Sequence, residues 1–193
     1  MKGNARNPVV VVSGPPGSGK STYAKRLARD LGLEYYSTGS IFRELARRRG
    51  VSLVELNRMA ESDPSIDAEI DRLTIERATR GGVVIDSHLA GFLLHSTADV
   101  LVYVKAPLRV RAHRIAQRDS KGFEEALLEI LERENSQITR FSRLYGFDAT
   151  DTSVFHVVVD TSAYGVEEAY TIIKEAVRLR LESLGYRLGA YRE

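Results

Sequence analysis

One stretch near the amino terminus carries residue types that suit phosphate chemistry. From Gly14 to Ser21 the sequence reads GPPGSGKS, which fits the pattern G-x-x-x-x-G-K-[S/T] in full. Backbone N–H groups of such a turn form a concave nest for anions, and the helix that follows presents its positive end to the phosphates. We expect Lys20 to reach the β- and γ-phosphates and Ser21 to ligate Mg²⁺. The residues expected to bind ATP are Gly14, Pro15, Pro16, Gly17, Ser18, Gly19, Lys20, Ser21 and Thr22.

A second acidic group is needed near that metal ion, and in P-loop proteins it usually ends an adjacent strand. The run VVID closes on Asp86, which suits this position. We therefore expect Ser21 and Asp86 to hold Mg²⁺ together with ATP. The alternative is an ordinary aspartate in the turn after a strand.

Short valine-rich runs separate stretches of helical pattern along the chain. Because these runs are continuous rather than alternating, they are typical of strands covered on both faces, as in a parallel sheet. The predicted strands are Val9–Val12, Leu33–Tyr36 (the weakest), Val83–Ile85, Val100–Val104 and Val154–Val159. The predicted helices span about 19–30, 40–49, 63–80, 107–118, 123–143 and 166–184, with a short one opened by a capping box at 52–55. The order predicts an α/β fold, doubly wound, as a single domain over residues 1–193.

Two helix-rich segments, about 40–80 and 114–145, are longer than strand crossovers require. Such excursions could be mobile flaps that close over a substrate. We expect the first to bind the acceptor and the second to form a lid.

Composition excludes several other classes of protein. There are no cysteines, so a disulfide framework and a thiolate metal site are ruled out, and the four histidines show no ligand spacing. No run approaches the ~18 apolar residues of a membrane span, and the first seven residues do not resemble a signal peptide. A net charge of +2 gives no basic field for nucleic acid. We expect a cytoplasmic monomer that binds neither membrane nor nucleic acid.

Arginine is the more frequent of the two cations, and its positions are informative. Arg111, Arg114 and Arg118 are spaced i, i+3, i+7 and share one face of a predicted helix. Without partners that stripe would repel itself, and an ATP tail would neutralise it. A solvated helix face is the alternative.

A second polar face lies on the helix predicted over 123–143. Arg133, Ser136, Gln137 and Arg140 share it, and we expect them to close the far side of the lid. Neighbouring glutamates leave a purely structural, salt-bridged helix as the competing interpretation. The side chains expected to act on the transferring phosphoryl group are Lys20, Arg114, Arg118, Arg133 and Arg140.

Among P-loop proteins, a GTPase would need an Asn-Lys-x-Asp guanine reader, which is absent, so chain length and element order favour a small-molecule kinase. The stretch YSTGSIFR from Tyr36 to Arg43 resembles the monophosphate-binding segment of nucleoside monophosphate kinases. This resemblance implies that Thr38, beside Ser37, contacts the acceptor nucleotide and that Arg43 binds its phosphate. A plain N-cap threonine and a solvated arginine are the alternative.

Longer strings are similar to the archaeal-type cytidylate kinases over about residues 8–177. They are SIFRELA after the Thr-Gly turn, DPSIDAEID from Asp63, VID-x-x-LAG from Val84, APL-x-VRA from Ala106 and R-x-YG-x-D from Arg143 to Asp148. The resemblance implies a three-layer P-loop kinase fold with a parallel five-stranded sheet, monophosphate-binding helices and lid helices. It also makes Arg114 and Arg118 phosphate or adenine contacts.

The sequence departs from that family after Asp86, where Ser87-His88 replaces the usual Gly-Arg. A histidine there could weaken phosphate binding or alter the choice of base. Gln137 stands where related bacterial enzymes use an acid to read cytosine. The acceptor-binding residues implied are Ser37, Thr38, Arg43, His88, Arg133 and Gln137.

These observations lead us to expect transfer of the γ-phosphoryl group of Mg²⁺-bound ATP to CMP or dCMP. Other acceptors remain open, namely AMP, UMP or an alcohol as in shikimate-type kinases. A nucleotide-dependent RNA-associated or regulatory protein is the alternative from another class. Its best feature is the cluster Arg47–Arg49, although cations are favoured at a helix carboxyl end in any case.

Overall fold

A single parallel sheet organises the part of the chain that the computed structural model describes, residues 7–187. Its strand order is β2-β3-β1-β4-β5. The bounds are β1 Val9–Ser13, β2 Glu34–Ser37, β3 Val83–Asp86, β4 Val100–Lys105 and β5 Val157–Asp160. The five predicted strands and their parallel arrangement are confirmed. The residues judged not to be a signal peptide lie largely outside the described range, as does the end of the carboxyl-terminal tail (188–193).

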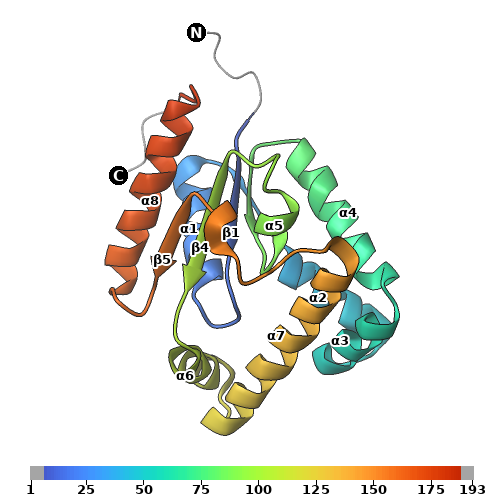
Figure 1. Ribbon diagram of the computed structural model, residues 1–193. Coiled ribbons are helices and arrows are strands. Elements are labelled where there is room, and N and C mark those ends of the chain that lie inside the picture. Colours follow the sequence, from blue (N-terminus) through green and yellow to red (C-terminus); the bar gives the residue numbers. More distant parts are fainter. Residues whose placement is uncertain (1–6, 188–193) are drawn as a thin grey trace.

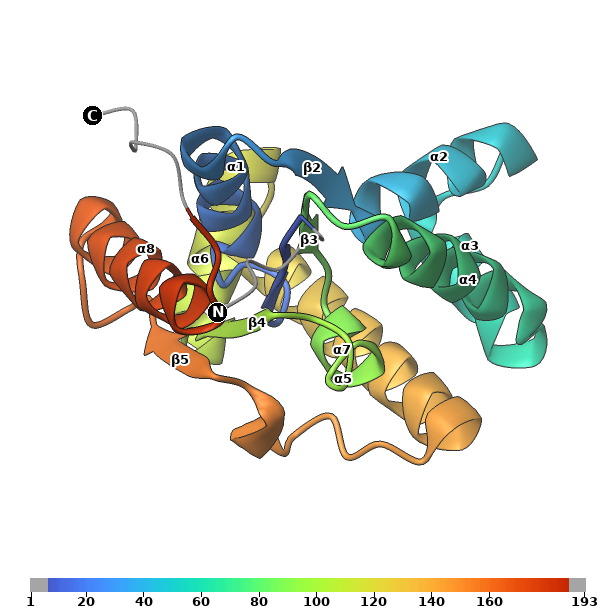
Figure 2. The same cartoon turned by 90° about the horizontal axis from the view of Figure 1, so that it is seen from above.

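Helices cover both faces of the sheet (Figures 1 and 2). Alternate valines of β1 point to opposite faces, so Val10 and Val12 pack with α1 (Lys20–Leu31) and α8 (Val166–Ser183). Val9 and Val11 pack instead with α4 (Ser65–Thr79), α5 (Ala90–Leu93) and α7 (Phe123–Tyr145). Burial on both faces is why the strands read as continuous apolar runs.

Helices α2 (Thr38–Arg49), α3 (Leu53–Ser62) and α6 (Leu108–Asp119) belong to two smaller packing units near the carboxyl ends of the strands. Helices α2 and α3 share a cluster that contains Ala46 and Leu56. Helix α6 packs on the first half of α7 through Ile115 and Ile130. Both units lie in the segments predicted to be flaps, and their own small cores let them keep their shape apart from the main core.

Local sequence signals explain where several helices begin. The capping box at α3 is confirmed, because the Ser52 hydroxyl accepts from the Glu55 N–H and the Glu55 carboxylate accepts from the Ser52 N–H. At α4 the Asp63 carboxylate accepts from the Ser65 N–H at 3.0 Å. Helix α4 begins at Ser65, two residues after the start predicted near residue 63.

Two elements differ from the prediction. Helix α5 has only four residues and no side-chain cap, so no periodic pattern announces it. The predicted strand over 154–159 begins instead at Val157, because Thr152–Val154 form a 3₁₀ turn capped by the Asp151 carboxylate. Phe155 then turns into the core against Phe92.

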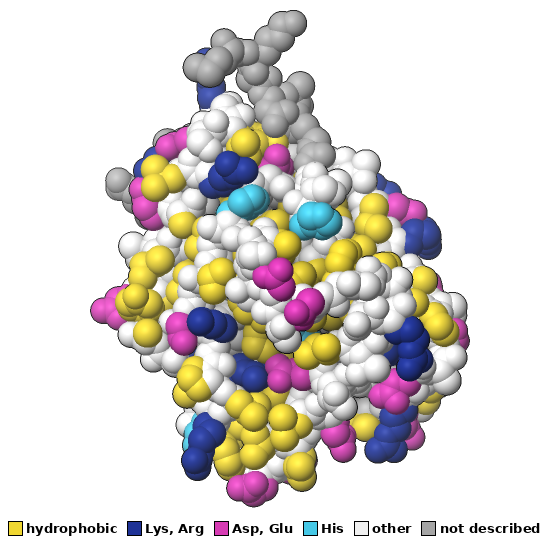
Figure 3. Space-filling view, viewed as in Figure 1, with side chains coloured by type: hydrophobic (Ala, Val, Ile, Leu, Met, Phe, Trp, Pro, Cys, Tyr) yellow, Lys and Arg dark blue, Asp and Glu magenta, His cyan; other side chains and the backbone are white. Residues whose placement is uncertain are grey.

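Within residues 7–187 no helix is both long and apolar enough to cross a membrane. On the face drawn in Figure 3, acidic and basic side chains are interspersed rather than gathered by sign.

Candidate functional site

The carboxyl ends of β1, β2 and β3 bring three predicted site segments to one edge of the sheet. Ser37, which ends β2, and Val12 in β1 both lie opposite Asp86 in the strand register. The phosphate loop follows β1 directly, and α2 begins directly after Ser37. Parallel strands therefore carry the loop, the acceptor segment and the acidic residue to a common end.

The phosphate loop has a backbone that glycine alone accommodates at two positions. Gly14 has φ 148°, and a Cβ there would lie 2.1 Å from the Val104 carbonyl oxygen. Gly17 has φ 80°, and a Cβ there would lie 2.7 Å from the Arg111 carbonyl oxygen. Helix α1 then begins at Lys20, so its first N–H groups face the loop.

A cavity of about 600 Å³, called here the phosphate pocket, lies above this loop. It brings together most of the predicted site, namely Pro16, Gly17, Lys20, Ser21, Ser37, Thr38, Arg43, Asp86, His88, Arg118, Arg133 and Gln137. Gly14, Pro15, Ser18 and Gly19 complete the loop around it, and Thr22 lies one residue further along α1 on an exposed surface. Arg114 and Arg140 lie outside its lining.

Lys20 lies in a strongly cationic part of the phosphate pocket. Burial lowers the pKa of Lys20 to about 8, the guanidinium groups of Arg133 and Arg118 push in the same direction, and the Asp86 carboxylate opposes them. Its ammonium lies 3.5 Å from the Pro15 carbonyl oxygen, its one hydrogen-bond partner among the described residues. An anion bound in the phosphate pocket would accept hydrogen bonds from the Lys20 ammonium.

Asp86 is 2% exposed, yet the described residues supply a donor to only one of its two carboxylate oxygens. The Tyr35 hydroxyl donates to Oδ2 at 2.6 Å, while no group in residues 7–187 is hydrogen-bonded to the buried Oδ1. A buried orphan acceptor of this kind suits a cation or its water shell. The described residues contain no group of three His, Cys, Asp or Glu side chains that could hold a metal. The single carboxylate of Asp86 is the kind of ligand that Mg²⁺ takes in such sites, where one or two carboxylates act together with substrate phosphates.

The acceptor segment meets the pocket at the start of α2. The Ser37 hydroxyl caps the helix by accepting from the Ser40 N–H at 3.3 Å. The Thr38 hydroxyl reaches the Asp86 carbonyl oxygen at 3.4 Å, which joins this segment to β3. Arg43 is exposed, and its one hydrogen-bond partner within residues 7–187 is the Ser40 hydroxyl of the same helix. Its guanidinium is therefore available to a ligand in the pocket.

The arginine stripe on α6 is not without partners, contrary to the expectation from sequence. Arg111 is buried, donates to the Pro16 carbonyl oxygen and pairs with Glu134 at 2.7 Å, so it supports the loop from behind. Arg114 donates to the backbone and hydroxyl of Thr161 and to the Gly17 carbonyl oxygen. Arg118 pairs with its neighbour Asp119. Only Arg118 of the three lines the phosphate pocket.

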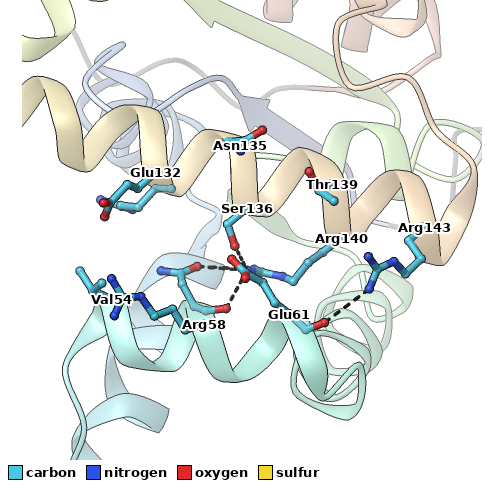
Figure 4. A pocket seen from close by; sticks show the side chains of 11 residues that line it. Val54, Arg58, Glu61, Glu132, Asn135, Ser136, Thr139, Arg140 and Arg143 are labelled. Carbon is cyan, nitrogen blue, oxygen red and sulfur yellow. Dashed lines mark hydrogen bonds between the residues drawn. The ribbon is translucent and has the colours of Figure 1, made fainter.

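The polar face of α7 is also divided in a way that the helical spacing did not predict. Arg133 and Gln137 line the phosphate pocket, whereas Arg140 is 4% exposed and pairs with Asp67 at 2.6 Å. Figure 4 shows Arg140 reaching across to α3 from α7, in a groove of about 570 Å³ between these helices. The Asn57 carbonyl oxygen accepts from it at 3.2 Å. Arg140 thus ties helices together where a phosphate contact was expected, because Asp67 supplies its counter-charge.

His88 does not act as the cation that the family arginine would be. Its Nδ1 lies 2.5 Å from Gln137 Oε1. Burial, with the nearby Lys20 charge acting in the same direction, lowers the pKa of His88 to about 3. The ring is neutral at pH 7 and joins β3 to α7 by a hydrogen bond.

His88 and Gln137 also form part of the wall of a second cavity of about 70 Å³, called here the small pocket. It shares Thr38, Gly39, Ser87, His88 and Gln137 with the phosphate pocket. It adds Asp67, Asp71 and Arg140 from α4 and α7. A polar recess therefore adjoins the acceptor end of the phosphate pocket.

The sequence patterns missed several residues of this site. Thr161, 1% exposed at the end of β5, donates to the Ser18 carbonyl oxygen at 2.8 Å and accepts from Arg114, so it joins the loop to α6. Its position two residues after the apolar run of β5 was the available signal. Tyr35 holds Asp86 from β2, and burial together with that hydrogen bond raises the pKa of Tyr35 to about 12. Asp71 ends the string DPSIDAEID, which indicated the family but assigned no role to this residue.

Comparisons with known proteins agree with this geometry. A family model described as an AAA domain matches residues 13–132. The cytidylate kinase of Aeropyrum pernix is 62% identical over 170 residues, covering 88% of this chain and 99% of that protein. The cytidylate kinase of Ignicoccus hospitalis is 56% identical, covering 86% and 96%.

Solved structures with low identity show the same fold. A gluconokinase from Sinorhizobium meliloti superposes with a TM-score of 0.58 at 20% identity, covering 92% of this chain and 95% of that one. A shikimate kinase from Acinetobacter baumannii gives 0.55 at 18%, covering 92% and 94%. Given its P-loop, its parallel sheet and relatives of this identity over most of its length, the chain belongs to the cytidylate kinase family.

Proposed function

We propose that this protein transfers the γ-phosphoryl group of ATP to the phosphate of CMP or dCMP. The observation that carries the proposal is the phosphate pocket, where the P-loop and the acceptor segment face one another. The names of the close relatives supply the acceptor. Bound at the two ends of one pocket, donor and acceptor would need no large translation to meet.

Positioning and charge neutralisation account for the chemistry. An acceptor phosphate is already ionised at neutral pH, so no general base is required, and His88 is not positioned as one. Lys20, Arg118 and Arg133 place cationic groups around the site of transfer. Ser21 and Asp86 are the residues that would hold Mg²⁺, which supplies further neutralisation of phosphate charge.

Water must be kept from the γ-phosphoryl group until the acceptor is present. The α2–α3 and α6–α7 units both contribute to the pocket wall, through Arg43 and Leu53 on one side and Arg118 and Arg133 on the other. We propose that they close when both substrates are bound, which would suppress hydrolysis of ATP.

Initial rates of ADP release from Mg-ATP with single acceptors test the proposal. CMP, dCMP, UMP, AMP, GMP and shikimate are supplied separately. CMP or dCMP should give turnover far above the others. A higher rate with AMP or shikimate, or none with any acceptor, would contradict the acceptor assignment and leave the fold intact.

The charged residues give little support to the alternative function, that of an RNA-associated protein. Of its arginine cluster, Arg47 and Arg48 are both paired with Glu44, at 2.6 and 2.8 Å. A gel-shift titration decides between the two classes: salt-sensitive RNA binding at sub-micromolar protein would favour the alternative, and its absence is expected.

A further inference from the structure

Asp71 in the wall of the small pocket has one carboxylate oxygen to which none of the described residues donates a hydrogen bond. Asp71 is 9% exposed, and its Oδ2 accepts from the Tyr145 hydroxyl at 2.6 Å. Among residues 7–187 no donor is hydrogen-bonded to its Oδ1. Asp67 differs, because the Arg140 guanidinium donates to both of its oxygens, at 2.6 and 3.3 Å. Of these two aspartates, only Asp71 has a carboxylate oxygen that accepts no hydrogen bond from the described residues.

The location of Asp71 relates it to the acceptor rather than to ATP. The small pocket joins the acceptor end of the phosphate pocket through Thr38, Gly39 and the His88–Gln137 pair. A nucleotide whose phosphate lies beside Arg43 would extend its base in this direction. The volume of about 70 Å³ is roughly that of two waters in the liquid. The recess must widen to take a base, and it favours the smaller pyrimidine ring over a purine.

The chemistry of the free oxygen distinguishes between pyrimidines. Cytosine carries an exocyclic amino donor where uracil carries a carbonyl acceptor. A carboxylate accepts a hydrogen bond from the amino group of cytosine, whereas it repels the carbonyl oxygen of uracil. We propose that Asp71 is a specificity-determining residue whose Oδ1 accepts a hydrogen bond from the exocyclic amino group of a cytosine base. This inference rests on the proposed function, because it concerns the acceptor of that reaction.

The ionisation of Asp71 is compatible with this role. Burial raises the pKa of Asp71 to about 6, the neighbouring Asp67 pushes in the same direction, and the bond from Tyr145 opposes the shift. At neutral pH the group remains mostly a carboxylate and is therefore an acceptor.

The test compares kcat/KM for CMP and UMP in wild type, Asp71→Asn and Tyr145→Phe. Tyr145→Phe is the matched control. It removes the hydrogen bond to Asp71 Oδ2, and Tyr145 is not among the residues that line the small pocket. Asp71→Asn should lower kcat/KM for CMP about tenfold or more and lower the CMP/UMP ratio with it, because the amide can turn a donor toward uracil. Tyr145→Phe should change that ratio less than about threefold.

A structural role for Asp71 predicts a different pattern. Both substrates would then lose activity together, with a lowered melting temperature and an unchanged CMP/UMP ratio, which overturns this inference and leaves the proposed function standing. If the wild-type protein had no activity on CMP, both the proposed function and this inference would be contradicted. Should Asp71→Asn not melt cooperatively, Asp71→Ser supplies the same comparison.

Discussion

At the scale of single residues, the phosphate pocket keeps charged groups in a state that a ligand completes. Lys20 is desolvated and surrounded by guanidinium groups, which is why its pKa falls to about 8. The phosphates of ATP would reverse this by stabilising the ammonium. Binding of ATP should therefore be coupled to proton uptake above pH 8.

The pH dependence of ATP binding tests this coupling. Below pH 8 Lys20 is protonated before ATP arrives, whereas above it the proton must be taken up on binding, so affinity should fall as pH rises from 7.5 to 9.5. The decrease approaches about tenfold per pH unit at the upper end. Calorimetry in buffers of different ionisation enthalpy measures both the affinity and the proton uptake. Lys20→Met should bind ATP weakly with a flat profile; an equal slope in the variant would contradict the assignment.

Asp86 provides the second residue-scale prediction, which concerns the metal. Asp86→Asn keeps the shape of the side chain but removes the charge beside the orphan Oδ1. The Mg²⁺ concentration that gives half-maximal rate should rise about 10- to 100-fold. A Mg²⁺ titration of the initial rate measures this, with the exposed Asp148→Asn as the matched control. No shift in the titration would mean that Asp86 does not contribute to metal binding.

At the scale of elements, Arg140 is a tie between α7 and the α3–α4 part of the acceptor segment. It is hydrogen-bonded to Asp67, Asn57 and Ser136, the last at 2.7 Å. A buried ion pair of this kind is costly to break from one side, because it leaves an unpaired charge in a dry environment. We infer that the tie fixes the distance between α7 and the acceptor helices.

Loss of this tie should destabilise the fold. Arg140→Ala should lower the free energy of unfolding by about 3–5 kcal/mol. Arg178→Ala on α8 is the control, since its pairs with Glu175 and Glu182 lie at an exposed surface and should matter much less. Urea denaturation measures both. Equal losses in the two variants would show that Arg140 does not act through its buried pair.

Helical spacing predicted which side chains share a face of α6 or α7 but not what that face meets. Arg111 and Arg140 both have i, i+3 or i+4 neighbours that line the phosphate pocket, yet each is taken up by a carboxylate from another helix, Glu134 or Asp67. Those pairs join residues 23 and 73 positions apart in the chain. No local pattern contains such a partner, so only the three-dimensional packing could assign these arginines to structural roles.

At the scale of the whole molecule, the parallel sheet was the feature that the sequence predicted most accurately. Valine runs buried on both faces fix the strands, and the P-loop and Asp86 follow because parallel strands end at the same edge. The short helix α5 and the start of β5 depended on caps and on Phe155 turning inward, which have no periodic signal. Thr161, Tyr35 and Asp71 entered the site through packing alone.

The two packing units outside the main core provide a test of closure. Amide exchange in residues 40–80 and 114–145 should slow most when CMP and a non-hydrolysable ATP analogue are both bound, and less with either alone. Helix α8, on the far side of the sheet, serves as the internal reference and should not change. Hydrogen exchange with mass spectrometry measures this. Equal protection by ATP analogue alone would contradict closure by both substrates.

In the proposed reaction the γ-phosphoryl group of ATP moves to an acceptor phosphate and not to water. Incubation with γ-labelled ATP, Mg²⁺ and CMP, followed by separation of the products, shows which acceptor receives the label. We expect label in the β-phosphate of CDP, with little in free phosphate, and a loss of that transfer by orders of magnitude in Lys20→Met. Label that appears chiefly as inorganic phosphate, or CDP formation that persists in Lys20→Met, would contradict the proposed reaction.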